Sequence, residues 1–345
     1  MRRAAPLAML LALACESAST DGTDLHGVYD KSTAPTASAS AAPTPSAKPS
    51  ASAEVRPTPR ERAPVAGTCI ADSGEAAQPG ERFGKRPGCR GARVFERRDA
   101  NGAPRYGCVY EAPEIEEREP LPLVVFLHGP FDDAAAVNDK TRLRALYHKL
   151  DLTGDPKHPG FIILSVQARK LAGSPSLRWD VDHHSRDNLD VVTIDHFVDD
   201  LLAEGRVDAR QIYAIGQGRG GVMANLYAML RPDRVAGFGA YAADASSLAW
   251  SCDAPPTPGA ILYRACDTIT PCADVERWLA VRSEQHAPTF SLRLDGVNGV
   301  EPSCALSKSA CREKRGTANH HRWPAKRERD LLEYLGQYSL AIEAP

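Results

Sequence analysis

A seven-residue apolar run, residues 121–127 (LPLVVFL), is the feature that most constrains the fold of this 345-residue chain. It has the length of a strand and no polar position, which is typical of a strand buried on both faces of a parallel sheet. Residues 161–166 (FIILSV) and 212–215 (IYAI) repeat the pattern. These runs predict a parallel sheet with both of its faces covered.

Helical patterns alternate with these strands. In residues 190–202 apolar side chains recur at helical spacing and acidic ones occupy the other face, which predicts an amphipathic helix. Further strands are expected in residues 91–110, 235–241, 260–263 and 289–294, and further helices over residues 222–230, 278–284 and 326–342. This alternation predicts an α/β protein with a mostly parallel, doubly wound sheet and helices on both faces.

Composition divides the chain into a linker and one large domain. Residues 32 to about 65 consist mainly of Ala, Ser, Pro and Thr, so we expect a disordered linker over residues 16–65. Residues 66–345, with a Cys-rich leading segment, can form one α/β domain, and 43% hydrophobic content can fill its core. The formal net charge of −2 shows no excess of basic residues of the kind that binds phosphates, so we expect no nucleic-acid partner.

The N-terminus has the features of an export signal. Arg2 and Arg3 precede an apolar run, residues 4–14, that is too short to span a bilayer. The run ends at Cys15 and resembles a bacterial lipoprotein signal over residues 1–15, although Ala12 stands where Leu is usual. Ordinary signal-peptide cleavage nearby is the alternative. We therefore expect a cell-envelope lipoprotein, attached to membrane only through a lipid anchor, or a secreted protein.

Nine cysteines fit this export prediction, because lipidation of Cys15 leaves an even number. Eight cysteines in an exported chain predict up to four disulfides. Short loops favour the pairs Cys266–Cys272 and Cys304–Cys311, and we expect Cys69, Cys89 and Cys108 to clamp the leading segment. The eight are Cys69, Cys89, Cys108, Cys252, Cys266, Cys272, Cys304 and Cys311. No C-x2-C pair or nearby histidine favours zinc, so no metal site is expected.

Polar and glycine-rich segments follow the predicted strands at the positions where ligands gather in open parallel sheets. In chain order these segments are residues 128–131 (HGPF), residues 216–221 (GQGRGG), Asp267 and residues 320–324 (HHRWP). The glycine run lies too late in the fold for a dinucleotide fingerprint, so no cofactor is expected. The order of turn, acid and histidine is the one that α/β-hydrolases use.

Residues 106–323 resemble the secreted polyhydroxybutyrate depolymerase and feruloyl esterase family of α/β-hydrolases. Residues 121–129 are similar to its oxyanion strand, and residues 207–213 to the segment that leads into its nucleophile turn. Residues 267–271 are similar to its acid turn, and residues 321–324 to its His-x-Trp-Pro motif. The resemblance implies an α/β-hydrolase fold and carboxylic ester hydrolysis. It assigns the acid to Asp267 and the base to His321, with His320 as the alternative.

Two departures put the activity in doubt. The family turn is Gly-x-Ser-x-Gly, and Gly218 stands at the serine, although Gly216, Gly220 and Gly221 keep the small residues that the turn needs. Glycine has no side chain that could attack a carbonyl.

The second departure concerns the oxyanion region, which comprises Gly129, Pro130, Phe131 and Arg219. The residue after His-Gly should offer an N–H to the oxyanion, and Pro130 has none.

These features predict an exported esterase-like protein with impaired catalysis that binds a polymer, glycan or ester ligand, or a partner protein. An active ester hydrolase, with a displaced nucleophile or a water activated by His321, is one alternative. A purely structural surface lipoprotein is the other.

Overall fold

The structure is a computed structural model that describes residues 58–80, 83–111, 119–157, 159–294, 304, 311 and 313–341. The predicted signal segment with Cys15 lies outside the described residues, as does the predicted linker up to residue 57. The end of that linker prediction is wrong. Strand β1 (Arg60–Arg62) pairs in parallel with strand β12 (Tyr338–Leu340), and the Arg62 guanidinium donates to the carbonyls of Pro232 and Val235. The folded domain therefore includes the described chain from Arg60 onward.

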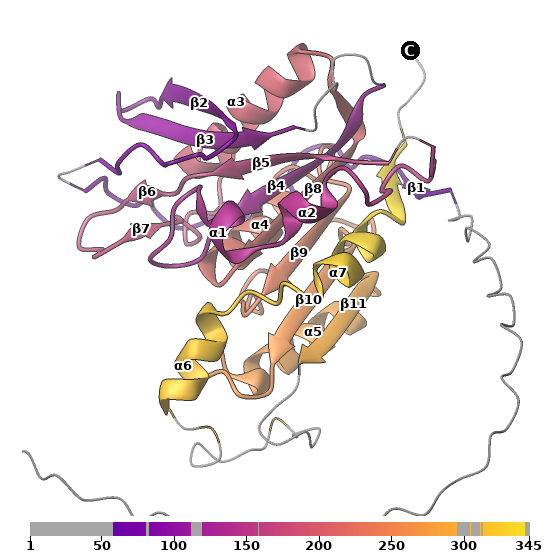
Figure 1. Cartoon of the computed structure of the whole chain (residues 1–345). Coiled ribbons are helices and arrows are strands. Elements are labelled where there is room, and N and C mark those ends of the chain that lie inside the picture. The colour runs from indigo at the N-terminus through magenta and orange to yellow at the C-terminus, as the bar shows by residue number, and fades with distance from the viewer. Residues whose placement is uncertain are drawn as a thin grey trace, which may run out of the picture. The chain divides into compact units, whose positions relative to one another are not determined.

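An eight-stranded sheet forms the centre of the fold, in the order β11-β10-β9-β8-β4-β5-β3-β2 (Figure 1). Strand β3 runs antiparallel to both of its neighbours, and the remaining pairings are parallel. The strands are β2 (Arg93–Arg98), β3 (Pro104–Tyr110), β4 (Leu121–Leu127), β5 (Ile162–Val166), β8 (Val207–Gln217), β9 (Gly237–Tyr241), β10 (Gly259–Arg264) and β11 (Thr289–Leu294). A mostly parallel sheet is confirmed. A short hairpin, β6 (Arg169–Lys170) with β7 (Leu177–Arg178), stands apart from it.

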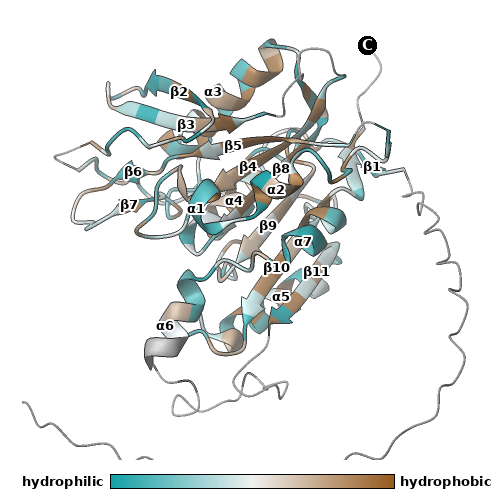
Figure 2. Ribbon diagram, viewed as in Figure 1, coloured by the Kyte–Doolittle hydropathy of each residue, from teal (hydrophilic) through white to brown (hydrophobic). Residues whose placement is uncertain are grey.

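Both faces of the sheet are covered by helices, as the apolar strand runs predict. Along β4, Leu123, Val125 and Leu127 join one core cluster, while Val124 and Phe126 join the other. The first cluster includes helices α3 (Leu189–Ala203), α4 (Arg219–Leu230) and α5 (Cys272–Glu284); the second includes α1 (Ala136–Lys140), α2 (Leu143–Leu146) and α7 (Glu328–Leu335). Figure 2 shows the apolar colouring concentrated on β4 and β5, where alternate side chains enter opposite cores.

The C-terminal region differs from the sequence prediction. We expected one helix over residues 326–342, but α7 ends at Leu335 and the chain continues as strand β12. The backbone N–H of Gly336 makes the last helical hydrogen bond, to the Leu332 carbonyl. The helix ends there because the following residues, Tyr338–Leu340, pair with β1. A further helix, α6 (Glu313–His321), was not predicted at all.

Four disulfides join the eight cysteines, and the predicted local pairs are wrong. Cys266 pairs with Cys311 and Cys272 with Cys304, so the turn between β10 and α5 is tied twice to the segment before α6. Cys69 pairs with Cys252 and Cys89 with Cys108, which fixes the leading segment to the domain. Four disulfides are typical of an oxidising compartment.

No helix in the described part of the chain is long and apolar enough to cross a membrane.

The two disulfides of the leading segment should differ in their contribution to stability. Cys69–Cys252 spans 183 residues and Cys89–Cys108 spans 19. Because a cross-link restricts the unfolded chain more when its loop is longer, removing the first pair should cost about 2 kcal/mol more than removing the second. Chemical denaturation of the two double Cys→Ala variants measures this difference. Each pair joins one fully buried and one half-buried cysteine, so the variants are matched. Equal losses would contradict the prediction.

Candidate functional site

The candidate site is built around a sharp turn between strand β8 and helix α4. Gly218 occupies this turn with φ 54° and ψ −125°, a conformation that side-chain-bearing residues rarely adopt. Its N–H donates to the Tyr241 carbonyl (2.8 Å), and its carbonyl accepts from the Val222 N–H (3.0 Å). The turn thus carries the last residue of β8 directly into the first turn of the helix.

The neighbouring glycines allow α4 to approach the ends of β8 and β4. A Cβ atom on Gly216 would overlap the Gly220 carbonyl, and one on Gly220 would overlap the Leu127 carbonyl. A Cβ atom on Gly221 would lie 2.9 Å from the Ala243 Cβ. All of these contacts involve backbone or short side chains that cannot move aside. The turn therefore requires the three glycines that the sequence retains.

A histidine–aspartate pair faces this turn, and its histidine is His320. The Nδ1 atom of His320 lies 3.1 Å from Oδ2 of Asp267, and both side chains are buried. The other carboxylate oxygen of Asp267 accepts the backbone N–H groups of Ile269 (2.8 Å) and Thr270 (2.9 Å). Asp267 lies just after β10, at the carboxyl end of the sheet.

The sequence assignment of the base to His321 is wrong in the structure. Residues 320 and 321 end helix α6, where neighbouring side chains point in different directions, so one of them faces Asp267 and the other does not. His321 instead packs against the ring of Phe131, with 6.1 Å between ring centroids. Partial burial lowers the pKa of His321, and the nearby His320 and Lys140 lower it further. Because α6 was not predicted, the directions of the two adjacent histidines were not predicted either, and this explains why the neighbouring residue was assigned.

Gly218 places no side chain next to His320, although the position is a close one. A Cβ atom built on Gly218 would lie 3.2 Å from Nε2 of His320. This nitrogen therefore faces the place that a nucleophile side chain would fill, and its opposite nitrogen is held by Asp267. A histidine–aspartate pair thus lies beside a turn position that carries no side chain.

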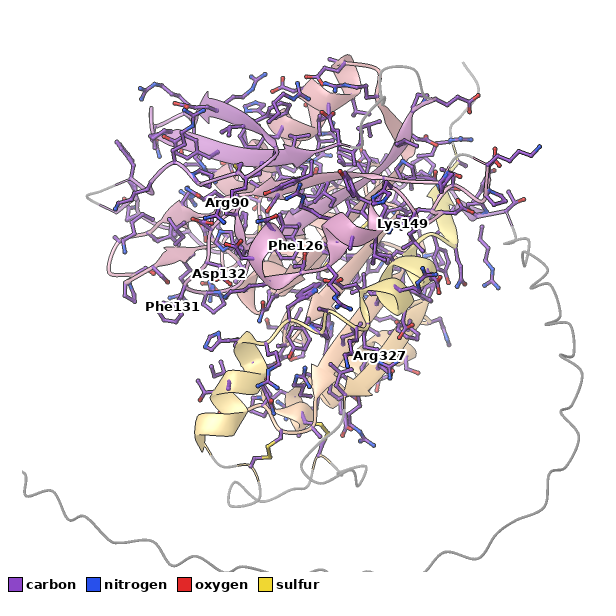
Figure 3. The ribbon with its side chains drawn as sticks, in the orientation of Figure 1. Arg90, Phe126, Phe131, Asp132, Lys149 and Arg327 are labelled. Atoms are coloured by element: carbon purple, nitrogen blue, oxygen red, sulfur yellow. A yellow bond between two sulfur atoms is a disulfide. The ribbon has the colours of Figure 1, made fainter. Side chains whose placement is uncertain are left out.

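Pro130 closes the other side of the same space. Its ring Cδ would lie 3.4 Å from a Cβ atom on Gly218. Because Cδ is bonded to the proline nitrogen, a methylene group stands where an oxyanion N–H would point. The second donor remains, since Arg219 is the first residue of α4 and its N–H has no intrahelical partner. Phe131 is 71% exposed, and Figure 3 shows its ring projecting away from the ribbon.

A buried histidine supports the segment that carries Pro130. Nε2 of His128 accepts the Ala168 N–H (3.1 Å), so Nδ1 carries the proton and donates to the Gly129 carbonyl (2.8 Å). Burial lowers the pKa of His128. The His128 carbonyl accepts from the indole N–H of Trp179 (2.9 Å). His128 is thus a neutral structural residue.

Two supporting groups have no counterpart in the sequence predictions. Asp190, at the start of α3, accepts from Arg105 (2.6 Å) and Arg169 (3.1 Å), and Arg169 also reaches Asp180 (3.1 Å), next to Trp179. These partners lie up to 85 residues apart in the chain, so no local sequence pattern reveals them.

The second supporting group is Glu328. Its buried carboxylate accepts the Arg142 N–H (2.8 and 2.9 Å) and the indole N–H of Trp323, which follows the histidine pair.

A pocket of about 580 Å³ opens beside the turn. It combines apolar side chains with three carboxylates, one guanidinium and two imidazoles. The lining includes Pro130, Gly218 and Ser247, the apolar side chains of Val181, Val222 and Ile269, the carboxylates of Asp182, Asp244 and Asp274, the Arg219 guanidinium, and the imidazoles of His184 and His320. His320 and the turn at Gly218 therefore border a space large enough for a small ligand.

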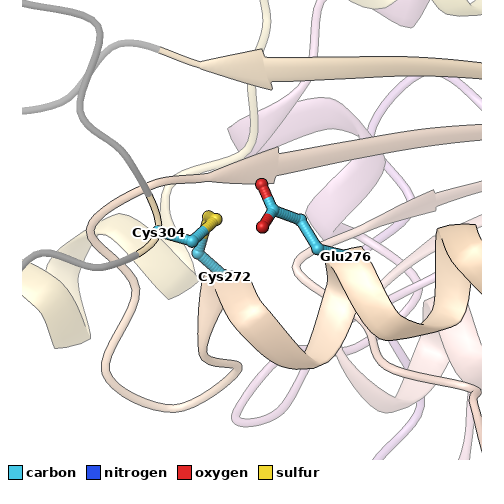
Figure 4. Close-up of side chains that lie close together, drawn as sticks. All are labelled: Cys272, Glu276 and Cys304. Atoms are coloured by element: carbon cyan, nitrogen blue, oxygen red, sulfur yellow. A yellow bond between two sulfur atoms is a disulfide. The ribbon is translucent and has the colours of Figure 1, made fainter.

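Another cluster of potential metal ligands lies at the start of α5. Cys272, Glu276 and Cys304 bring their ligand atoms within 4.8 Å of one another (Figure 4). The two sulfurs form a disulfide, whereas metal binding requires thiolates. Glu276 also accepts from Arg293 (3.2 Å). The chemistry of these residues does not favour a metal site.

Comparison with known proteins identifies the fold. No family model and no curated protein matches the chain. Among solved structures, esterase 2 of Thermogutta terrifontis phosphonylated by cyclosarin is 14% identical, with a TM-score of 0.50, over 72% of this chain and 92% of that chain. A thermostable esterase is 17% identical (TM-score 0.48; 73% of this chain and 64% of that chain), and a ferulic acid esterase is 14% identical (TM-score 0.48; 59% and 90%). The match thus covers less than two thirds of the thermostable esterase. The chain has the α/β-hydrolase fold.

Replacement of Gly220 by alanine should disrupt the turn. Its new Cβ would overlap the Leu127 carbonyl, so strand β4 and helix α4 would have to separate. We expect a loss of about 3 kcal/mol or more in the free energy of unfolding, measured by urea denaturation. Gly88→Ala is the control, because a Cβ there meets nothing within 4 Å. A Gly220→Ala variant as stable as this control would contradict the packing described.

The Glu328 carboxyl should make stability depend on pH. Burial raises its pKa to about 7, against 4.5 for an exposed glutamate, so folding favours the protonated form. Its contribution is fully present below about pH 4.5 and is lost as the pH rises through about 7, by roughly 3 kcal/mol. Subtracting the unfolding free energy of Glu328→Gln from that of the wild type, pH by pH, isolates this decline. The exposed Glu284→Gln should leave the wild-type profile unchanged. A wild-type profile parallel to that of Glu328→Gln would contradict the assignment.

Proposed function

We propose that this chain is an exported protein with an esterase-like α/β-hydrolase fold that no longer hydrolyses esters and instead binds a ligand or partner in the retained cleft. The observation that carries the proposal is Gly218, which places no side chain at the position 3.2 Å from His320 Nε2 where a Cβ atom would lie. The turn and the histidine–aspartate pair are those of an ester hydrolase, but the attacking group is absent.

The expected sizes of the two rate losses favour complete loss of ester hydrolysis over a merely reduced rate. Removal of the nucleophile of a serine hydrolase lowers turnover on the order of 10⁶-fold, as in the known case of subtilisin. Loss of one oxyanion donor costs about 10²–10³-fold. Gly218 and Pro130 affect both groups, and their positions converge on one space. Two changes at one point suggest a site released from selection for hydrolysis.

Export of the protein is part of the proposal. Four disulfides favour an oxidising compartment. Together with the signal-like residues 1–15, they support a cell-envelope lipoprotein anchored through Cys15, or a secreted form. The ligand proposed from the family resemblance is a polymer, a glycan or an ester.

Residual hydrolysis is the second candidate, and retention of the His320–Asp267 pair is the observation that favours it. A water molecule beside Gly218 could lose a proton to Nε2, or Ser247 of the same pocket could act as a displaced nucleophile. A fluorophosphonate probe labels the wild type only in the second case, and Ser247→Ala then abolishes labelling. Turnover of an ester without labelling would identify the water mechanism.

Restoring the missing groups should restore reactivity in two steps. Wild type should not react with a fluorophosphonate, whereas Gly218→Ser should be labelled slowly because His320 can activate the new hydroxyl. Adding Pro130→Gly returns an N–H and should raise the labelling rate by about 10²-fold. The measurement is the rate of covalent labelling, followed by intact-protein mass spectrometry.

Two control variants define the interpretation. Gly218→Ala reports the steric cost of a Cβ at this turn without adding a nucleophile. His320→Ala in the Gly218→Ser background should abolish labelling. A folded Gly218→Ser, Pro130→Gly variant that stays unlabelled would sink the idea that only the nucleophile and one donor are missing.

A further inference from the structure

We infer that the ligand of this cleft carries a primary ammonium group on an apolar stem. The inference rests on the proposed function, that is, on a cleft that binds without hydrolysing. It depends on three features of the pocket: an imidazole nitrogen that opens on it, an excess of carboxylates and a missing oxyanion donor.

The imidazole nitrogen is Nε2 of His320. The Asp267 carboxylate accepts a hydrogen bond from Nδ1, and in the tautomer with its proton on Nδ1 the ring presents a lone pair at Nε2. The residue is 3% exposed, and within the described residues no donor is bonded to Nε2. Nε2 faces the space beside Gly218, where the pocket opens. Nε2 borders the pocket, so a ligand that donates an N–H or O–H here forms a hydrogen bond with an otherwise buried imidazole.

The charges of the pocket favour a cation. Three carboxylates line it, those of Asp182, Asp244 and Asp274, against the single guanidinium of Arg219. Arg219 is already paired with Asp182, at 2.7 Å. Asp274 is half-buried and is paired with Arg277 (2.5 Å), which lies outside the pocket lining. Asp244 is also half-buried and, within the described residues, has no cationic partner, so the three carboxylates outnumber the two guanidiniums by one. Cationic ligands are therefore attracted and anionic ones repelled.

Pro130 argues against an ester carbonyl at the same point. A carbonyl oxygen directed at the former oxyanion position would meet the proline methylene on one side and only the Arg219 N–H on the other. The rest of the lining is apolar, with Val181, Val222 and Ile269 among its members. A linear alkyl stem that ends in an ammonium group matches both parts of the pocket.

Binding of three matched five-carbon probes tests the inference. Calorimetry with the mature protein compares n-pentylamine, 1-pentanol and pentanoate, which differ only in the head group. We expect the amine to bind at least about 10-fold more tightly than the alcohol, and pentanoate more weakly than either. The affinity for the amine should fall with added salt, while that for the alcohol should not.

Variants that neutralise single carboxylates test whether these charges cause the preference for the amine. Asp244→Asn and Asp274→Asn should each weaken amine binding by about 5-fold and leave alcohol binding unchanged. Glu96→Gln, an exposed acid on edge strand β2, is the control and should change neither. Gly218→Ala should weaken both amine and alcohol, because its Cβ fills the space before His320.

The outcomes separate this inference from the proposed function. Equal affinity for amine and alcohol, unchanged by either Asn variant, would overturn the ammonium assignment and leave a binding cleft in place. Failure of the amine to bind at millimolar concentration would overturn it as well. Turnover of ethyl butanoate would contradict the non-hydrolytic function, while the comparison of amine with alcohol would still report on the pocket.

Discussion

The site depends on the close approach of helix α4 to the carboxyl ends of β4 and β8. Only glycine permits this approach, because a Cβ atom at position 216 or 220 would overlap a backbone carbonyl. The backbone contact fixes the direction of the turn at Gly218 and the start of α4 at Arg219. The geometry of the turn is thus set by main-chain packing and does not depend on a side chain at position 218.

Retention of the acid has a structural explanation as well as a catalytic one. Asp267 also accepts two backbone N–H groups of its own turn, and that turn is tied by disulfides to the segment before α6. The backbone carbonyl of His320 accepts from Gln217 (2.6 Å), just before the glycine turn. Removing the Asp267 carboxylate would deprive the N–H groups of Ile269 and Thr270 of their acceptor, whereas the Gln217 bond uses the main chain of residue 320. The aspartate therefore has a structural role apart from hydrolysis, and His320 leaves Nε2 available to a ligand.

The sequence predicted the parts of the fold that local patterns specify. The apolar run at Leu121–Leu127 coincides with β4, because burial on both faces removes every polar position. Local patterns failed where distant contacts decide. The unpredicted helix α6 turns His320, rather than His321, toward Asp267. Cys266 and Cys272 bond to a returning segment instead of to each other, and residues 338–340 form a strand only because β1 lies beside them.

The central claim is that this site keeps the architecture of an ester hydrolase without its reaction. The most direct measurement is the hydrolysis of 4-nitrophenyl and feruloyl esters by purified wild type and by His320→Ala. The account predicts equal rates for the two proteins, indistinguishable from the uncatalysed reaction. Turnover by the wild type in the usual enzymatic range of roughly 1–10³ s⁻¹, lost in His320→Ala, would contradict it.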